Sequence, residues 1–335
     1  MNLENREFVV SVVIPTRNRP ELVSRAVRSA LNQTYKSLEV IVVIDGPDPA
    51  TEKALDALQE PRLRVVSLRA NLGGSETRNI GAKEAKGQWV ALLDDDDEWL
   101  TTKIEAQIAL CRRSTYKFPV VSSRLIARSP TADYVWPERA PLIPIADYLM
   151  KRPGLFQGNG LLQTSTLLVP TQLLKECPFT TGLRKHQDWD WLIRVLELPG
   201  AGIEFVPEPL VIWYIEERRS SISGTNDWRF SVEWLDSVKT LCSKTSYASF
   251  LLTVVSPTAA DKCQWSAFLP LLTKAFREGK PQLIHVILHC AFWLLPRDTR
   301  RFFRSLSKGH VRNLNFIDTT RGTANPPAYR MGTTL

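Results

Sequence analysis

The first 125 residues alternate short β-branched runs with segments of helical periodicity. Apolar runs with the length and composition of buried strands lie at residues 8–14, 40–44, 63–68, 89–93 and 120–125. Between these runs, apolar residues recur every three or four positions and predict helices at 21–33, 50–59, 75–86 and 100–113. Strands that alternate with helices predict an α/β fold with a mainly parallel sheet flanked by helices.

Polar residues follow three of these predicted strands at the point where each strand ends. They occupy positions 16–19, 45–48 and 94–97. The carboxyl ends of parallel strands meet at one edge of a sheet, where open α/β sheets bind their ligands. The sequence therefore predicts a binding site built from these three loops.

The pattern changes beyond residue 125. Residues 126–222 are less regular, although a helix is predicted near 187–196, and the pattern is helical from about residue 226 onward. We expect an α/β domain with two halves, a helical C-terminal region and a flexible tail, at 1–100 and 101–224, 225–317, and 318–335 respectively.

The 335-residue chain has a formal charge of +8, and 44% of its residues are apolar, enough for a sizeable core. The charge is concentrated at one end. Residues 297–335 hold eight basic and two acidic side chains, so the other 296 residues carry only +2. The first 280 residues contain no recognisable nucleic-acid-binding motif and no alternation of basic and aromatic residues. We therefore expect no nucleic-acid partner.

The five cysteines contain no CxxC pair, which argues against a disulfide framework and a zinc site. We find no signal-peptide pattern and no run of about 20 apolar residues that could span a membrane. The expected location is the cytoplasm, with attachment to the inner membrane face as an open alternative.

Four consecutive aspartates, 94–97, follow the predicted strand at 89–93. Their mutual repulsion is costly, and a divalent cation such as Mg²⁺ or Mn²⁺ would remove that cost. The alternative is a solvated acidic turn that favours the dipole of the next helix. Because the run lies between a buried strand and Trp99, we predict metal binding.

Two further features lie at the same predicted edge. Asp45 closes the second strand, where it is either a turn residue or an acceptor for a base or ribose. Gly73 and Gly74 precede a helix, where they form either a tight turn or a close approach of the backbone to a diphosphate.

Taken together, these segments resemble the family 2 glycosyltransferases, which have the Rossmann-like GT-A fold. The segments are SVVIPTRNRP at 11–20, LNQTYKSLEVIVVIDG at 31–46 and NLGGSETRNIGAKEAKGQWVALLDDDDEWL at 71–100. A looser resemblance continues through HQDWDWLIR at 186–194, VPEPL at 206–210 and RRSSIS at 218–223.

The resemblance implies an inverting, metal-dependent enzyme that moves a sugar from a nucleotide-diphosphate sugar to a hydroxyl of a glycan or lipid-linked acceptor. The setting would be the synthesis of cell-surface polysaccharide or lipopolysaccharide. Residues 1–100 would hold the donor and residues 101–224 the acceptor.

Site residues follow from the same resemblance. Asp45 would read the nucleobase, with Pro15, Thr16 and Arg17 lining its pocket. In the DxD motif, Asp95 would face the ribose, and Asp94 and Asp96 would contact the donor and the Mg²⁺ or Mn²⁺ ion. Arg218 would bind the diphosphate.

Asp188 would be the catalytic base that deprotonates the acceptor hydroxyl. The alternative is a carboxylate that stabilises the start of a helix through the dipole. Asp190 lies four residues before Arg194, which is ion-pair spacing and indicates a structural role. His186 is either a contact in the site or a surface group, and Trp189 and Trp191 either stack on sugars or pack in the core.

Two departures from the family pattern support an alternative function. Ile44 replaces an aspartate and Gln187 replaces a glutamate, as in a catalytically decayed module that binds sugar nucleotides or glycans. A sugar nucleotidyltransferase is less favoured, because such enzymes have a glycine-rich loop after the first strand and residues 16–20 contain no glycine.

The apolar segment 281–295 also has two interpretations. It is either a buried helix of a small bundle or a helix that lies on a membrane. Arg297, Arg300, Arg301 and Arg304 follow it, so residues 281–312 could meet an anionic membrane surface.

Overall fold

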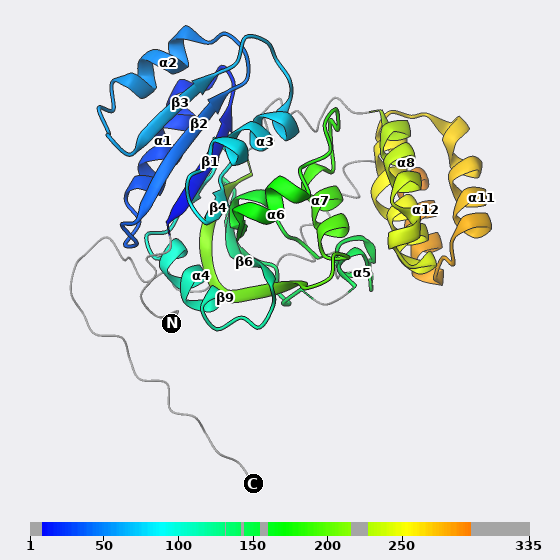
Figure 1. Ribbon diagram of the computed structural model, residues 1–335. Coiled ribbons are helices and arrows are strands. Elements are labelled where there is room, and N and C mark those ends of the chain that lie inside the picture. The colour runs from blue at the N-terminus through cyan, green and yellow to red at the C-terminus, as the bar shows by residue number, and fades with distance from the viewer. Residues whose placement is uncertain (1–8, 131, 142–143, 155–159, 216–226, 296–335) are drawn as a thin grey trace.

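The computed structural model describes residues 9–130, 132–141, 144–154, 160–215 and 227–295 (Figure 1). Its centre is one sheet in the order β3-β2-β1-β4-β8-β6-β9-β5, with β7 paired to β6. The first four of these strands are mutually parallel, as the sequence predicts. They are β1 (Val10–Thr16), β2 (Leu38–Ile44), β3 (Leu63–Ser67) and β4 (Trp89–Leu92).

The second half of the sheet mixes parallel and antiparallel pairs. Strand β8 runs antiparallel to both β4 and β6, while β6 and β9 are parallel and β5 pairs antiparallel with β9. These strands are β5 (Glu98–Trp99), β6 (Phe118–Arg128), β7 (Asp133–Trp136), β8 (Leu168–Pro170) and β9 (Ala201–Tyr214). The sequence did not reveal β5, which has only two residues, or β7, which has no fully buried residue.

Alternating side chains on the strands supply two separate cores, one on each face of the sheet. Val13 and Ile41 point to the face covered by α3 and α7, whereas Val12 and Val40 point to the face covered by α1. The helices around the sheet are α1 (Pro20–Leu31), α2 (Pro49–Asp56), α3 (Gly74–Glu84), α4 (Lys103–Cys111), α5 (Ile145–Met150), α6 (Thr171–Glu176) and α7 (Gln187–Val195).

Helix α3 lies unusually close to the sheet because of one glycine. A Cβ on Gly81 would stand only 2.3 Å from Cγ1 of Val13 on β1, so any other residue would push the helix outward. The other glycine that matters precedes the helix: Gly73 has a φ of +87°, a conformation that side chains disfavour. Gly73 therefore permits the turn at which α3 begins, and Gly81 permits the close packing of α3 on the sheet.

The C-terminal helices gather beside α5 and α7 (Figure 1). They are α8 (Trp228–Ser237), α9 (Lys244–Phe250), α10 (Ser256–Asp261), α11 (Phe268–Glu278) and α12 (Leu283–Leu294), with a π-helical turn at Leu251–Val255. Their buried side chains continue the core on the α7 face of the sheet. The predicted helical C-terminal extension is therefore confirmed for the described residues 227–295, whereas residues 296–317 and the predicted tail at 318–335 lie outside them. None of the helices among the described residues is both long and apolar enough to cross a membrane.

Candidate active site

The loops after β1 and β4 meet at the sheet edge and bond directly to each other. Thr16 Oγ1 donates to Asp95 Oδ2 at 2.7 Å, and Arg19 Nη1 donates to Asp95 Oδ1 at 2.9 Å. Burial raises the pKa of Asp95 to about 6, although the Arg19 charge works in the opposite direction. Both oxygens of Asp95 thus accept bonds from the chain itself and tie the two loops together.

Asp94 and Asp96 are more accessible than their neighbours. Their side chains are 25% and 31% exposed, compared with 8% for Asp95. Asp96 Oδ2 lies 3.4 Å from Arg19 Nη1. Asp97 is fully buried and accepts bonds from Ser165 Oγ and Gln163 Nε2, both at 2.5 Å. Asp97 therefore anchors the loop from beneath, and Asp94 and Asp96 are the carboxylates that a ligand can reach.

The donor set fits Mg²⁺ or Mn²⁺ held jointly with a phosphate group. Hard divalent cations take carboxylate oxygens, and Mg²⁺ is commonly held by one or two carboxylates plus substrate phosphates. Within the described residues, no cluster of three or more Asp, Glu, His or Cys side chains is arranged to hold a metal. Asp94 and Asp96 would therefore need diphosphate oxygens or water to complete the coordination.

Arg78, on α3, connects the acidic loop to the start of α7. Its Nη2 donates to Asp94 Oδ1 at 2.5 Å and its Nη1 donates to Gln187 Oε1 at 2.8 Å. The sequence analysis did not select Arg78. The available signal was a charged residue between Thr77 and Asn79 on the buried side of a predicted helix, where an arginine needs a partner.

Asp188 follows Gln187 and lies beside this link. Its Oδ1 accepts the backbone N–H of Trp189 at 2.9 Å. Burial raises the pKa of Asp188 to about 6, the negative charge of Asp94 adds to the rise, and the Arg78 guanidinium opposes it. A carboxylate with this pKa can accept a proton near neutral pH.

Asp45 lies at the end of β2, as expected, and its contacts are with the loop before α3. Oδ1 accepts the N–H of Leu72 at 2.7 Å, and Oδ2 accepts the N–H of Gly73 at 3.1 Å. Asp45 therefore orients the glycine loop next to the site. On the neighbouring loop, Thr16 is buried and Arg17 is exposed.

The sheet edge thus brings together most of the predicted site residues: Pro15, Thr16, Arg17, Asp45, Asp94, Asp95, Asp96 and Asp188. Arg218 lies outside the described residues. Arg19, Gln163 and Ser165 are contacts that the sequence analysis did not select.

The other candidates near α7 are structural. Trp191 is buried, stacks on Phe179 at 5.3 Å between ring centroids, and donates to the Cys177 carbonyl at 2.7 Å. His186 stacks on Trp234 at 4.5 Å and bonds Ser231 Oγ at 2.9 Å. Burial lowers the pKa of His186 to about 3, so this ring stays neutral. The ring is half-buried and packs against Trp189, Trp234 and Phe250.

Asp190 has the structural role that its spacing predicts, and its removal should destabilise the fold. Its carboxylate accepts bonds from Arg194 Nε at 2.9 Å, Thr180 Oγ1 at 2.7 Å and Trp234 Nε1 at 3.2 Å. We expect Asp190→Ala to lower the free energy of unfolding by about 3–5 kcal/mol, as for other buried ion pairs that lose one partner. Urea denaturation measures this. Asp133→Ala, which breaks an exposed pair with Arg128, should cost about 1 kcal/mol or less; equal losses would contradict the assignment.

Comparison with known proteins identifies the class to which this site belongs. The family model described as "Glycosyl transferase family 2" matches residues 11–170, which contain the three loops. Residues 11–170 therefore match a family 2 glycosyltransferase domain. Amylovoran biosynthesis glycosyltransferase AmsB of Erwinia amylovora is 28% identical over 243 residues, which cover 70% of this chain and 79% of AmsB.

Two further comparisons concern a shorter segment and the fold. The UDP-Glc:alpha-D-GlcNAc-diphosphoundecaprenol beta-1,3-glucosyltransferase WfaP of Escherichia coli is 36% identical over 100 residues, 30% of this chain and 40% of WfaP. The mannosyltransferase PcManGT of Pyrobaculum calidifontis, solved in complex with GDP-Man and Mn²⁺, superposes with a TM-score of 0.57. At 17% identity, over 91% of this chain and 85% of that structure, the likeness establishes the GT-A fold.

Proposed function

We propose that this glycosyltransferase inverts the anomeric carbon as it moves a sugar from a nucleotide-diphosphate sugar to a hydroxyl of a glycan or lipid-linked acceptor. The observation that carries the proposal is the connection from Asp94 through Arg78 to Gln187, which brings Asp188 to the acidic loop. One carboxylate with a raised pKa then lies beside two accessible carboxylates that suit a metal and a diphosphate.

Asp188 is the proposed base. Its Oδ1 is held by the Trp189 N–H, so Oδ2 accepts the proton of the acceptor hydroxyl. The acceptor oxygen then forms a bond to the anomeric carbon while the bond from that carbon to the diphosphate oxygen breaks. The electron pair of the broken bond leaves with the nucleoside diphosphate. This single displacement inverts the anomeric centre and needs no covalent intermediate with the protein.

Asp94 and Asp96 are the proposed ligands of Mg²⁺ or Mn²⁺. When bound, such a cation supplies Lewis-acid stabilisation of the charge that develops on the leaving diphosphate. Asp95 and Arg19 keep the loop in position for this role, and we propose that Asp95 also lies near the ribose. Asp45, with Pro15, Thr16 and Arg17, forms the proposed nucleobase pocket, and Arg218 is proposed to bind the diphosphate.

Two relatives support the choice of acceptor and setting. One is a biosynthetic glycosyltransferase for amylovoran, and the other has a diphosphoundecaprenol-linked sugar in its name. We therefore propose a role in the synthesis of cell-surface polysaccharide, carried out at the cytoplasmic face of a membrane. Residues 1–224 would form the transferase unit, with 225–317 appended to it and 318–335 as a tail.

A donor screen tests the proposal against the decayed-module alternative. With one nucleotide sugar and Mn²⁺ present together, we expect a rise in melting temperature, because a ligand that binds only the folded state stabilises it. That donor should also yield nucleoside diphosphate once a lipid-linked or glycan acceptor is added. Stabilisation without any release of nucleoside diphosphate, across donors and acceptors, would instead identify a binding module.

A further inference from the structure

The outer face of α12 exposes apolar side chains along its whole length. Leu283, Ile287 and Leu294 are 76%, 49% and 72% exposed, and their spacing of four and seven residues puts them on one stripe. The opposite face is buried, through His285, Leu288, His289, Phe292 and Trp293. A helix on a water-facing surface normally carries charged or polar residues on its outer face, and α12 contains no charged residue.

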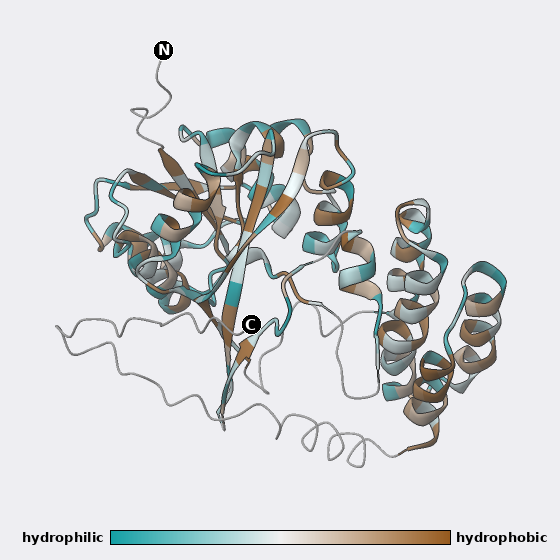
Figure 2. Ribbon diagram, turned by 90° about the horizontal axis from the view of Figure 1, so that it is seen from below, coloured by the Kyte–Doolittle hydropathy of each residue, from teal (hydrophilic) through white to brown (hydrophobic). Residues whose placement is uncertain are grey.

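Helix α11 and the turn before it add to this surface. Leu269 and Phe276, seven residues apart, are 65% and 60% exposed, and Trp265 is 56% exposed. The Trp265 ring lies 5.2 Å from that of Trp293 between centroids, so the start of α11 lies against the end of α12. The ribbon of α12 is coloured as hydrophobic up to the end of the helix (Figure 2). Two neighbouring helices, α11 and α12, therefore both expose apolar side chains.

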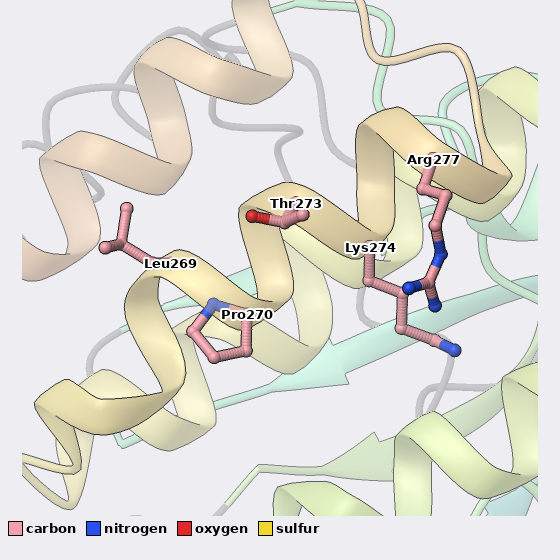
Figure 3. Close-up of a pocket in the computed structure, with 5 residues that line it drawn as sticks. All are labelled: Leu269, Pro270, Thr273, Lys274 and Arg277. Atoms are coloured by element: carbon pink, nitrogen blue, oxygen red, sulfur yellow. The ribbon is translucent and has the colours of Figure 1, made fainter.

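The sequence around these stripes carries an excess of positive charge, although Lys274 is ion-paired with Asp236 and Glu278. Residues 262–295 contain four basic side chains and one acidic side chain, Glu278. Arg277 is bonded to Glu278, yet its side chain remains 70% exposed. Leu269, Pro270 and Thr273 line a shallow surface pocket on α11 together with Lys274 and Arg277, so apolar and cationic groups share one helix (Figure 3). In the sequence, residues 296–312 add six basic side chains and one acidic side chain.

We propose that the outer faces of α11 and α12, here called the helical docking face, seat this protein on an anionic lipid bilayer. Apolar side chains flanked by basic ones are the pattern of helices that lie in the headgroup region. With 12 residues, α12 is about 18 Å long and cannot cross a hydrocarbon core of about 30 Å, so it lies along the surface. A second copy of this chain would bring the same positive charge to the contact and repel it.

The docking face rests on the proposed function in one respect: a lipid-linked acceptor presents its sugar at the membrane surface. An enzyme seated by α11 and α12 meets such acceptors by diffusion within the membrane plane. The binding of lipid itself needs only the residues of the docking face. Vesicle binding and sugar transfer can therefore be measured independently of each other.

Co-sedimentation of the full chain with lipid vesicles tests the inference. We expect binding to vesicles of phosphatidylcholine and phosphatidylglycerol in a 7:3 ratio, and at least tenfold weaker binding to phosphatidylcholine alone. The double substitution Leu283→Glu/Leu294→Glu should weaken binding to the mixed vesicles at least tenfold. The matched control is Val65→Glu/Tyr116→Glu, which puts the same charges on exposed apolar positions far from α11 and α12 in the sequence. This control should bind vesicles as the unchanged protein does.

Several results would overturn the inference. The first is unchanged binding by the Leu283→Glu/Leu294→Glu variant, and the second is an equal loss in the control. The third concerns the oligomeric state in lipid-free buffer. If the unchanged protein is a dimer, the Leu283→Glu/Leu294→Glu variant is a monomer and both bind vesicles equally, the face joins two copies of the chain. If the glutamate variant fails to fold by circular dichroism, Leu283→Ser/Leu294→Ser replaces it. Release of nucleoside diphosphate with a water-soluble acceptor should be unaffected, which separates this test from that of the transferase activity.

Discussion

Asp188→Asn is expected to lower kcat by about 10²- to 10⁴-fold while the affinity for the donor stays the same. This range is typical for the loss of a general base. Asparagine keeps the size of the side chain and can still accept the Trp189 N–H through its carbonyl oxygen, so α7 should keep its start. It has no basic oxygen to take the proton of the acceptor hydroxyl. Steady-state kinetics, with donor affinity from calorimetry, measure both effects.

The pH profile sharpens the same prediction. A base works only in its deprotonated form, so with a pKa of about 6 for Asp188, kcat/KM should be level above pH 6 and fall about tenfold per pH unit below it. The residual activity of Asp188→Asn should lack this fall. Asp56→Asn, an equivalent change at an exposed position on α2, serves as the control and should keep both the rate and the profile. Retention of the full rate by Asp188→Asn would exclude the proposed mechanism.

The sheet edge was predictable because its signals are local. Strands β1, β2 and β4 are continuous apolar runs that end in polar residues, and parallel strands bring those ends together. That is why Thr16, Asp45 and Asp95 were found at their expected edge.

The contacts between distant segments were not predictable in this way. Arg78 and Gln187 are 109 residues apart, and nothing in either local pattern indicates the other. The same holds for Asp97 and Ser165, which are 68 residues apart, although the bond between them decides which aspartates of the run face outward. Four identical side chains in a row received their different environments from the tertiary fold.

The contacts of Gln187 also change its interpretation, because the sequence analysis took this residue as a sign of lost catalytic activity. In the structure its amide oxygen accepts from Arg78, and its amide nitrogen donates to the Leu183 carbonyl at 2.5 Å. A neutral amide can make both bonds at once, whereas a glutamate could only accept. Gln187 therefore orients Arg78 and the start of α7, and its presence gives no support to the loss of activity.

Asp96→Asn is expected to remove the effect of the metal on donor binding and to lower kcat by about 10²- to 10³-fold. That range is typical when one preorganised stabiliser of transition-state charge is lost. Because the chain offers two accessible carboxylates, Mn²⁺ alone should bind weakly and shift the melting temperature little. Nucleoside diphosphate and Mn²⁺ together should raise it clearly, since the phosphate oxygens complete the coordination. In Asp96→Asn this joint rise should disappear.

Removal of the metal tests the role of Asp96 independently of the substitution. Chelation with EDTA should lower the activity of the unchanged protein to the level of Asp96→Asn, and added Mn²⁺ should restore only the former. Asp56→Asn again tests for an effect of the substitution alone and should respond to Mn²⁺ as the unchanged protein does. The Asp96 side chain is partly exposed, and Asp95 and Asp97 hold the loop through their own bonds, so its substitution should not unfold the site. An Asp96→Asn protein that retains the joint rise and full activity would show that the cation, if used, is held elsewhere.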